Sequence, residues 1–206
     1  MQENIKKIHF GSGHPRPKSD KDLAIRLLFE GNSFRSVGRI IGVSHQSISK
    51  WLKQYTSSLP NEEVGDLSDG VEVDELCTFF KKVKNNKETQ TAKRTWVWVG
   101  ICRRTPKVVG CTVGTRGVKT FKPLYDTLVS NGCDKFYTDK YNVYQSVIDC
   151  THVQSKAFTT HVESFWSDVR LYIKGLNRRT KCCFKKLETL LYMLRLYIHN
   201  YNLKLA

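Results

Sequence analysis

Apolar residues recur every three or four positions in the first quarter of the chain, a spacing that predicts helices. Glycine-containing pairs at Gly31-Asn32 and Gly42-Val43 interrupt the pattern and divide it into three segments. A residue with a short polar side chain precedes or opens each segment and could cap the helix. The expected caps are Asp20, Ser33 and Ser44. We therefore expect three helices between residues 19 and 55.

The second and third expected helices are separated by a tight turn at Gly42, as in a helix-turn-helix. We expect Ile40, Ile48 and Leu52 to hold these two helices together. Polar side chains at the exposed positions of the third helix could bond base edges or reach phosphates. These candidates for DNA contact are Ser44, His45, Gln46, Ser47, Lys50 and Lys53. A three-helix bundle that contacts other proteins is the alternative.

Beyond residue 70 the pattern changes to the alternating and β-branched runs that are typical of strands. Strands are expected at 71–80, 94–102, 107–115, 135–138 and 152–155, and helices at 118–131, 141–148, 162–175 and 184–201. The order β-β-β-α-β-α-β-α predicts an α/β class, with a ribonuclease-H-like mixed sheet flanked by helices.

The chain is therefore expected to have four parts. These are a flexible arm at 1–18, a helix-turn-helix domain at 19–56, a linker at 57–70 and a ribonuclease-H-like domain at 71–206. The linker is rich in Ser, Pro, Gly and acidic residues, a composition that separates domains.

The charge balance favours a polyanionic partner. Lys and Arg total 34 and Asp and Glu total 19, a net charge of +15. Residues 76–206 hold 24 basic and 8 acidic residues, so 24 − 8 = +16 lies there. Such an excess concentrates nucleic acid near the surface, with acidic membranes and plain solubility as the alternatives.

Cysteine usage and hydropathy exclude several classes of protein. Seven cysteines without a C-x-x-C pair argue against a disulfide framework and against a zinc site. No apolar run reaches the roughly 20 residues of a membrane-spanning helix. We therefore expect a cytoplasmic, DNA-associated protein that contacts no membrane.

Three carboxylates stand where such a sheet would bring them together. Asp74 lies within the first expected strand, Asp139 directly follows the strand at 135–138, and Glu163 is near the start of a late helix. Converging carboxylates suit Mg²⁺ or Mn²⁺ and the in-line displacement of phosphoryl transfer. Taken singly, each acid could instead be a turn residue, a helix cap or a charge for the helix macrodipole.

Neighbouring residues leave alternatives open. Glu72 and Glu75 compete with Asp74, although Glu75 should point to the opposite face of the strand, and Asp168 competes with Glu163. His161, two residues before Glu163, could assist at the site. The basic cluster after the Glu163 helix could contact the DNA backbone or form a solvated loop. Its members are Arg178, Arg179 and Lys181.

The blocks V-D-E, Y-T-D-K-Y-x-x-Y and H-V-E-S-F-W-S-D-V-R resemble the catalytic blocks of DDE transposases of insertion sequences. The closest resemblance is to the first-described insertion-sequence family and its short relatives, over about residues 19–204. It implies that Asp74, Asp139 and Glu163 are the catalytic metal ligands. It also implies support or DNA contact from four residues: Tyr141, Tyr144, Trp166 and Arg170.

Two features depart from that family. Lys140 replaces the glycine of the usual T-D-G block, and no cysteine precedes Cys77, so the N-terminal zinc ribbon of the family is not expected.

The resemblance implies a transposase that cleaves element ends and transfers them to double-stranded target DNA, as a homo-oligomer. A helix-turn-helix regulator, or a decayed and inactive copy, is the first alternative. A repair-type nuclease on the same fold is another. The chain lacks the constellation that a tyrosine or serine recombinase requires.

Overall fold

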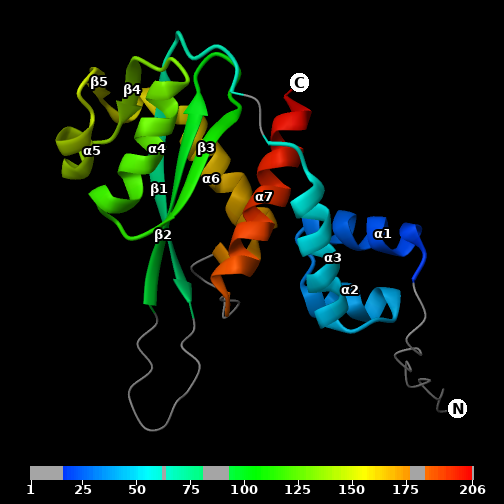
Figure 1. Ribbon diagram of the computed structural model, residues 1–206. Coiled ribbons are helices and arrows are strands. Elements are labelled where there is room, and N and C mark those ends of the chain that lie inside the picture. The colour runs from blue at the N-terminus through cyan, green and yellow to red at the C-terminus, as the bar shows by residue number, and fades with distance from the viewer. Residues whose placement is uncertain (1–15, 62–63, 81–92, 177–183, 206) are drawn as a thin grey trace, which may run out of the picture. The chain divides into compact units, whose positions relative to one another are not determined.

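The structure is a computed structural model, and it describes residues 16–61, 64–80, 93–176 and 184–205. The chain divides into two compact units, Met1–Leu59 and Pro60–Ala206. The described part of the first unit is helical, and the second combines a sheet with helices (Figure 1). Most of the expected arm, residues 1–15, lies outside the described residues.

The N-terminal unit contains the three expected helices. They are α1 (Lys18–Phe29), α2 (Phe34–Ile41) and α3 (His45–Ser58). The hydroxyls of Ser33 and Ser44 accept bonds from the backbone N–H groups of Ser36 and Ser47, so both expected caps are confirmed. Gly42 joins α2 to α3 with a left-handed φ of 77°, a conformation that favours glycine.

Two expectations for this unit are wrong. Asp20 is not a cap, because α1 begins at Lys18 after Pro17; Asp20 lies in the first turn, 3.6 Å from the Arg16 guanidinium. Ile40 does not hold α2 to α3, because it is 58% exposed. The buried positions of α2 are Val37 and Gly38, and those of α3 include Ile48 and Leu52, as expected.

The C-terminal unit is built on one mixed sheet in the order β3-β2-β1-β4-β5. The strands are β1 (Val71–Phe80), β2 (Lys93–Cys102), β3 (Val108–Gly114), β4 (Lys135–Thr138) and β5 (Thr151–Gln154). The first three form an antiparallel meander, while β4 runs parallel to β1 and β5 runs parallel to β4. The expected mixed sheet with flanking helices is confirmed.

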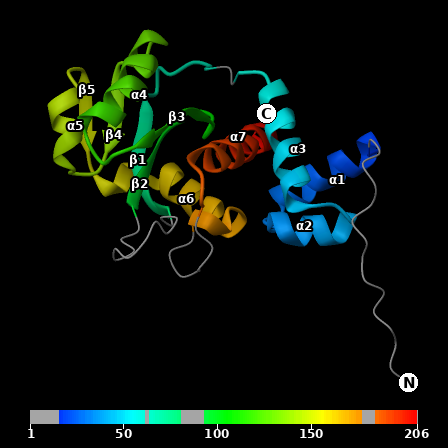
Figure 2. The ribbon, with the colours of Figure 1, turned by 60° about the horizontal axis from the view of Figure 1, so that its bottom comes forward.

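Helices cover both faces of this sheet (Figures 1 and 2). They are α4 (Val118–Ser130), α5 (Asn142–Val147), α6 (Thr160–Tyr172) and α7 (Leu187–Lys204), with single 3₁₀ turns at Lys156–Phe158 and Lys174–Leu176. Helices α4 and α5 pack on one face and α6 and α7 on the other. The last two helices differ most from expectation: α6 spans Thr160–Tyr172 instead of 162–175, and α7 spans Leu187–Lys204 instead of 184–201.

The face under α4 and α5 carries the aromatic part of the core. Trp98 is fully buried there and stacks on Phe121 with ring centroids 5.3 Å apart. Helix α4 approaches closely because β3 has a glycine beneath it: a Cβ on Gly110 would lie 2.4 Å from the side chain of Leu124. Among the described residues, no helix combines the length and apolar character needed to cross a bilayer.

Candidate active site

The first expected carboxylate, Asp74, lies in the middle of β1 on the face that α6 covers. Alternation along the strand places Glu72 on the same face and Glu75 on the opposite one, where it contacts Tyr144 of α5. Asp74 is partly buried. The sheet therefore separates the two adjacent acids and leaves Asp74 on the side of Glu163.

The second carboxylate, Asp139, follows the last residue of β4. In the parallel pairing of β1 with β4, Val71 lies opposite Phe136 and Glu72 opposite Tyr137, an offset of 136 − 71 = 65. The same offset relates Asp74 to Asp139, since 139 − 74 = 65. The register of two neighbouring strands thus directs both acids to one level of the sheet.

Asp139 is held in a tight turn. Its Oδ1 accepts a bond of 2.8 Å from the backbone N–H of Tyr141, which lets the chain turn out of β4. The hydroxyl of the preceding Thr138 bonds the Asp139 carbonyl at 2.8 Å and lies 2.7 Å from Nε2 of His152. Burial lowers the pKa of His152, which favours its neutral form at this position.

The third carboxylate, Glu163, is an exposed side chain in the first turn of α6. The helix-mate Trp166 does not share its exposure: Trp166 is 2% exposed, a core position that does not suit DNA contact. Asp168, the alternative to Glu163, is also exposed and lies more than one turn further along.

The ionisation of Asp74 is strongly perturbed. Its pKa is raised to about 7, chiefly because burial disfavours the charged form. The neighbouring negative charges of Glu75, Asp139 and Glu163 raise it further. Such mutual repulsion is the condition that a bound cation relieves.

The donor chemistry fits a hard divalent cation, because Asp74, the Asp139 that follows β4 and the Glu163 of α6 are all carboxylates, and the latter two act electrostatically on Asp74. The side chains do not form a finished coordination sphere, however. Within the described residues, no three His, Cys, Asp or Glu side chains are arranged to hold a metal ion. Asp139 Oδ1, for example, is engaged by its own turn.

A polar cluster supports the site from the opposite face of β1. The buried Glu75 accepts bonds from the Tyr144 hydroxyl at 2.6 Å and from Nε of Arg116 at 2.7 Å. The Arg116 guanidinium lies over the rings of Trp96, at 4.5 Å, and Tyr141, at 4.0 Å. Burial raises the pKa of Glu75, while Tyr144 and Arg116 lower it. Glu75 is thus a structural partner of Arg116 and Tyr144 on the face of β1 opposite to Asp74.

Two arginines near the site were missed by sequence reasoning. Arg116 belongs to the turn between β3 and α4, and Arg103 follows β2. Arg103 lies 3.8 Å from the buried Glu72 carboxylate. Nothing in the local sequence links either arginine to an acid 31 or 41 positions away (103 − 72; 116 − 75). Only the pairing of strands brings them together.

The recognition candidates on α3 divide into two groups. His45, Gln46, Lys50 and Lys53 are exposed. Ser44 and Ser47 are half-buried and bond each other at 2.9 Å within the cap, so their hydroxyls already have partners. The exposed surface of α3 is therefore narrower than expected from the sequence.

The remaining candidates are placed as follows. Tyr141 donates to the backbone carbonyl of Arg116 at 2.9 Å, and Tyr144 is fully buried, so both support the structure. Arg170 is half-buried in the last turn of α6. The basic cluster of Arg178, Arg179 and Lys181 lies outside the described residues.

Comparison with known proteins supplies the family. A family model described as IS1 transposase matches residues 73–203. The match spans 203 − 73 + 1 = 131 of the 206 residues and includes all three carboxylates. A search of curated proteins found no match to the chain.

Proposed function

Because the chain belongs to the IS1 transposase family, we propose that it cleaves DNA at insertion-sequence ends and joins those ends to target DNA by metal-dependent phosphoryl transfer. The observation that carries this proposal is the placement of the acids: the β1–β4 register brings Asp74 and Asp139 to one level of the sheet, and Glu163 lies on α6, which packs on β1. The raised pKa of the buried Asp74 agrees with this placement. Structural acids are seldom grouped at such a cost without a cation or a reaction to serve.

We assign Asp74, Asp139 and Glu163 as the ligands of Mg²⁺ or Mn²⁺. When held by these residues, the cation would supply the Lewis acidity that activates an oxygen nucleophile, water or a 3′ hydroxyl, and that stabilises a leaving oxygen. The protein contributes the placement of the three acids: parallel register aligns Asp74 with Asp139, and α6 presents Glu163. No zinc is required.

No covalent protein–DNA intermediate is needed in this scheme. Tyr141 is the first tyrosine after Asp139 in the sequence. Its hydroxyl already donates a hydrogen bond to the Arg116 carbonyl. Tyr137 packs its ring against Arg103 with 4.1 Å between the guanidinium carbon and the ring centroid. Both tyrosines therefore serve as structural residues.

We propose that residues 19–56 form a helix-turn-helix domain that binds double-stranded DNA through α3. The left-handed turn at Gly42 and the exposed His45, Gln46, Lys50 and Lys53 support this assignment. Residues 57–70 would link this domain to the catalytic domain at 71–206. Because transposition joins two element ends, we expect the protein to act as a homo-oligomer on DNA.

The test is strand cleavage and strand transfer on labelled element-end DNA with Mg²⁺ or Mn²⁺. We expect the wild type to act, and Asp139→Asn and Glu163→Gln to bind the same DNA without cutting it. Asp126→Asn and Glu188→Gln are matched controls, because both acids are exposed and lie in helices that carry none of the three carboxylates. A wild type that binds the DNA but cuts with neither metal would establish a DNA-binding regulator or an inactive copy instead.

A further inference from the structure

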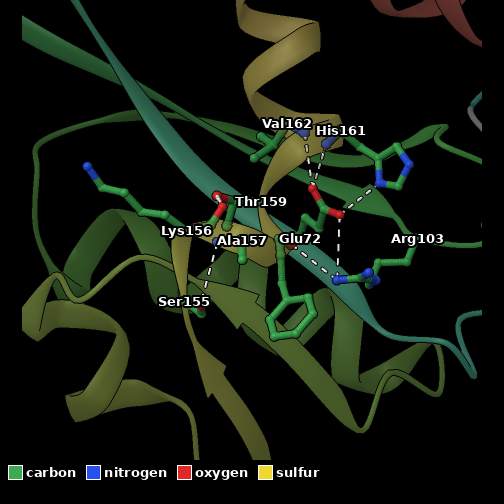
Figure 3. A network of polar contacts seen from close by, with 9 residues as sticks. Glu72, Arg103, Ser155, Lys156, Ala157, Thr159, His161 and Val162 are labelled. Carbon is green, nitrogen blue, oxygen red and sulfur yellow. Dashed lines mark hydrogen bonds and ion pairs between the residues drawn. The ribbon is translucent and has the colours of Figure 1, made fainter.

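Glu72 is a carboxylate with no exposed surface, two residues before Asp74 on the same face of β1. A buried charge is costly unless it is paired and hydrogen-bonded. Glu72 accepts bonds from the backbone N–H groups of His161 at 2.9 Å and Val162 at 3.2 Å, and lies 2.7 Å from Nδ1 of His161 (Figure 3). The Arg103 guanidinium is 3.8 Å away.

These contacts replace the missing cap of α6. The first amides of a helix need acceptors from outside the helix. The residue at the N-cap position, Thr159, makes no side-chain cap bond. Glu72 supplies both the acceptor oxygens and a negative charge at the positive end of the helix dipole. A strand side chain therefore sets where α6 begins.

Arg103 extends the contact to the other two elements of the site. Its guanidinium lies over the ring of Tyr137 in β4 at 4.1 Å and donates to the carbonyl of Phe158, just before α6, at 3.2 Å. Tyr137 is the register partner of Glu72, and Asp139 stands two residues beyond it, as Asp74 stands two residues beyond Glu72. The Glu72–Arg103 pair thus joins β1, β4 and α6, the three elements that carry the carboxylates.

We propose that Glu72 is a positioning residue for the active site: it holds the first turn of α6 on β1 and so sets the place of Glu163 relative to Asp74. The proposal rests on the proposed role of Glu163 as a metal ligand. It also explains why the fully buried acid lies at the N-terminal end of α6, which has no side-chain cap of its own.

The test is the metal dependence of cleavage by Glu72→Gln. The amide keeps the size of the side chain but removes its charge and turns one acceptor into a donor. We expect the metal concentration for half-maximal cleavage to rise about 10- to 100-fold, as for other partners of metal ligands. DNA affinity should stay within about twofold, since this substitution leaves α3 unchanged.

Asn202→Ala is the control for general destabilisation. The Asn202 amide bonds the backbone N–H and carbonyl of Val108, both at 2.9 Å, and links α7 to β3 rather than to the carboxylates. This variant should lower the unfolding temperature without changing the metal requirement. If both variants shift the metal requirement equally, Glu72 is merely structural and the proposal is wrong.

Two further measurements separate this proposal from the proposed function. Amide hydrogen exchange at His161 and Val162 should become roughly fivefold faster or more in Glu72→Gln, as for loss of a helix cap, whether or not the protein cuts DNA. Arg103→Met should raise the metal requirement in the same direction, and decides the matter if Glu72→Gln does not fold. A wild type that never cuts overturns the proposed function, whereas unchanged exchange and metal dependence in the variants overturn the role of Glu72.

Discussion

At the scale of single residues, the Asp74 carboxylate lowers the free energy of unfolding by an amount that depends on pH. Its pKa rises from 3.8 to about 7 on folding, first because of burial and then because of neighbouring acids. The folded state therefore binds a proton more tightly than the unfolded state. Stability is greatest below the unfolded pKa and is lost as the pH rises toward the folded pKa.

Asp74→Asn should remove this cost in metal-free protein. We expect the variant to gain up to roughly 4 kcal/mol over the wild type at pH 8 and progressively less toward pH 4, given about 1.4 kcal/mol per pKa unit. Urea unfolding in EDTA at several pH values measures the difference. Asp126→Asn, on an exposed acid paired with Lys122, should show no such trend. A gain that does not depend on pH would contradict the assigned cause.

Arg116 is the partner that allows Glu75 to stay buried beside the site. Arg116→Ala leaves the Glu75 carboxylate with the Tyr144 hydroxyl as its remaining hydrogen-bond donor among the described residues. We expect a loss of roughly 2 kcal/mol, since an unpaired buried charge is more costly than the removal of a whole pair. The double variant Arg116→Ala with Glu75→Gln should recover part of that loss. Additive losses in this cycle would show that the two side chains are not coupled.

At the scale of elements, the sequence predicted what local patterns determine. Strands β1 and β4 have the expected bounds, because each consists of a run of β-branched, aromatic or alternating apolar residues that ends abruptly. The cap at Asp20 was wrong, because Pro17 permits an earlier start of α1. The prediction that Ile40 packs between α2 and α3 was wrong, because Gly38 makes the close contact between α2 and the turn. Periodicity of apolar residues cannot detect a contact made by a residue without a side chain.

That contact can be tested with Gly38→Ala. A Cβ at this position would lie 2.6 Å from the Val43 carbonyl oxygen, which is backbone and part of the turn before α3. Alanine favours helices, but here we expect a net loss of about 1 to 3 kcal/mol from the forced shift. Faster amide exchange along α3 measures it. Gly65→Ala, with no atom within 4 Å of the added Cβ, is the control; equal exchange in both variants would contradict the close approach.

At the scale of the whole molecule, the sequence located the candidate acids but not the network that supports them. Asp74, Asp139 and Glu163 stood out because the order of elements gave each a place. The sequence left Glu72 and Asp74 as alternatives for the same role. Only the packing of α6 on β1 distinguishes them: Glu72 is buried and caps α6, whereas Asp74 feels the charges of Asp139 and Glu163. Contacts between distant residues follow from topology, which short patterns do not encode.

The division of the chain into two units predicts that DNA binding and DNA cutting can be impaired separately. Lys50→Ala with Lys53→Ala removes two exposed cations from α3. Each phosphate that is no longer neutralised should lower the salt dependence of binding by about one unit of slope. We expect weaker binding to all DNA sequences, measured by titration at several salt concentrations. Cleavage at saturating DNA should be retained, because the three carboxylates lie in the other unit.

The matched control for charge is Lys119→Ala with Lys122→Ala, which removes two exposed cations from α4. If this control lowers affinity and salt slope as much as the α3 variant does, the net charge of the protein dominates binding and α3 has no special role. If the α3 variant alone loses affinity but also stops cutting at saturating DNA, recognition and chemistry are coupled. Retained cutting together with a selective loss of affinity is the outcome that assigns recognition to α3 and chemistry to the sheet.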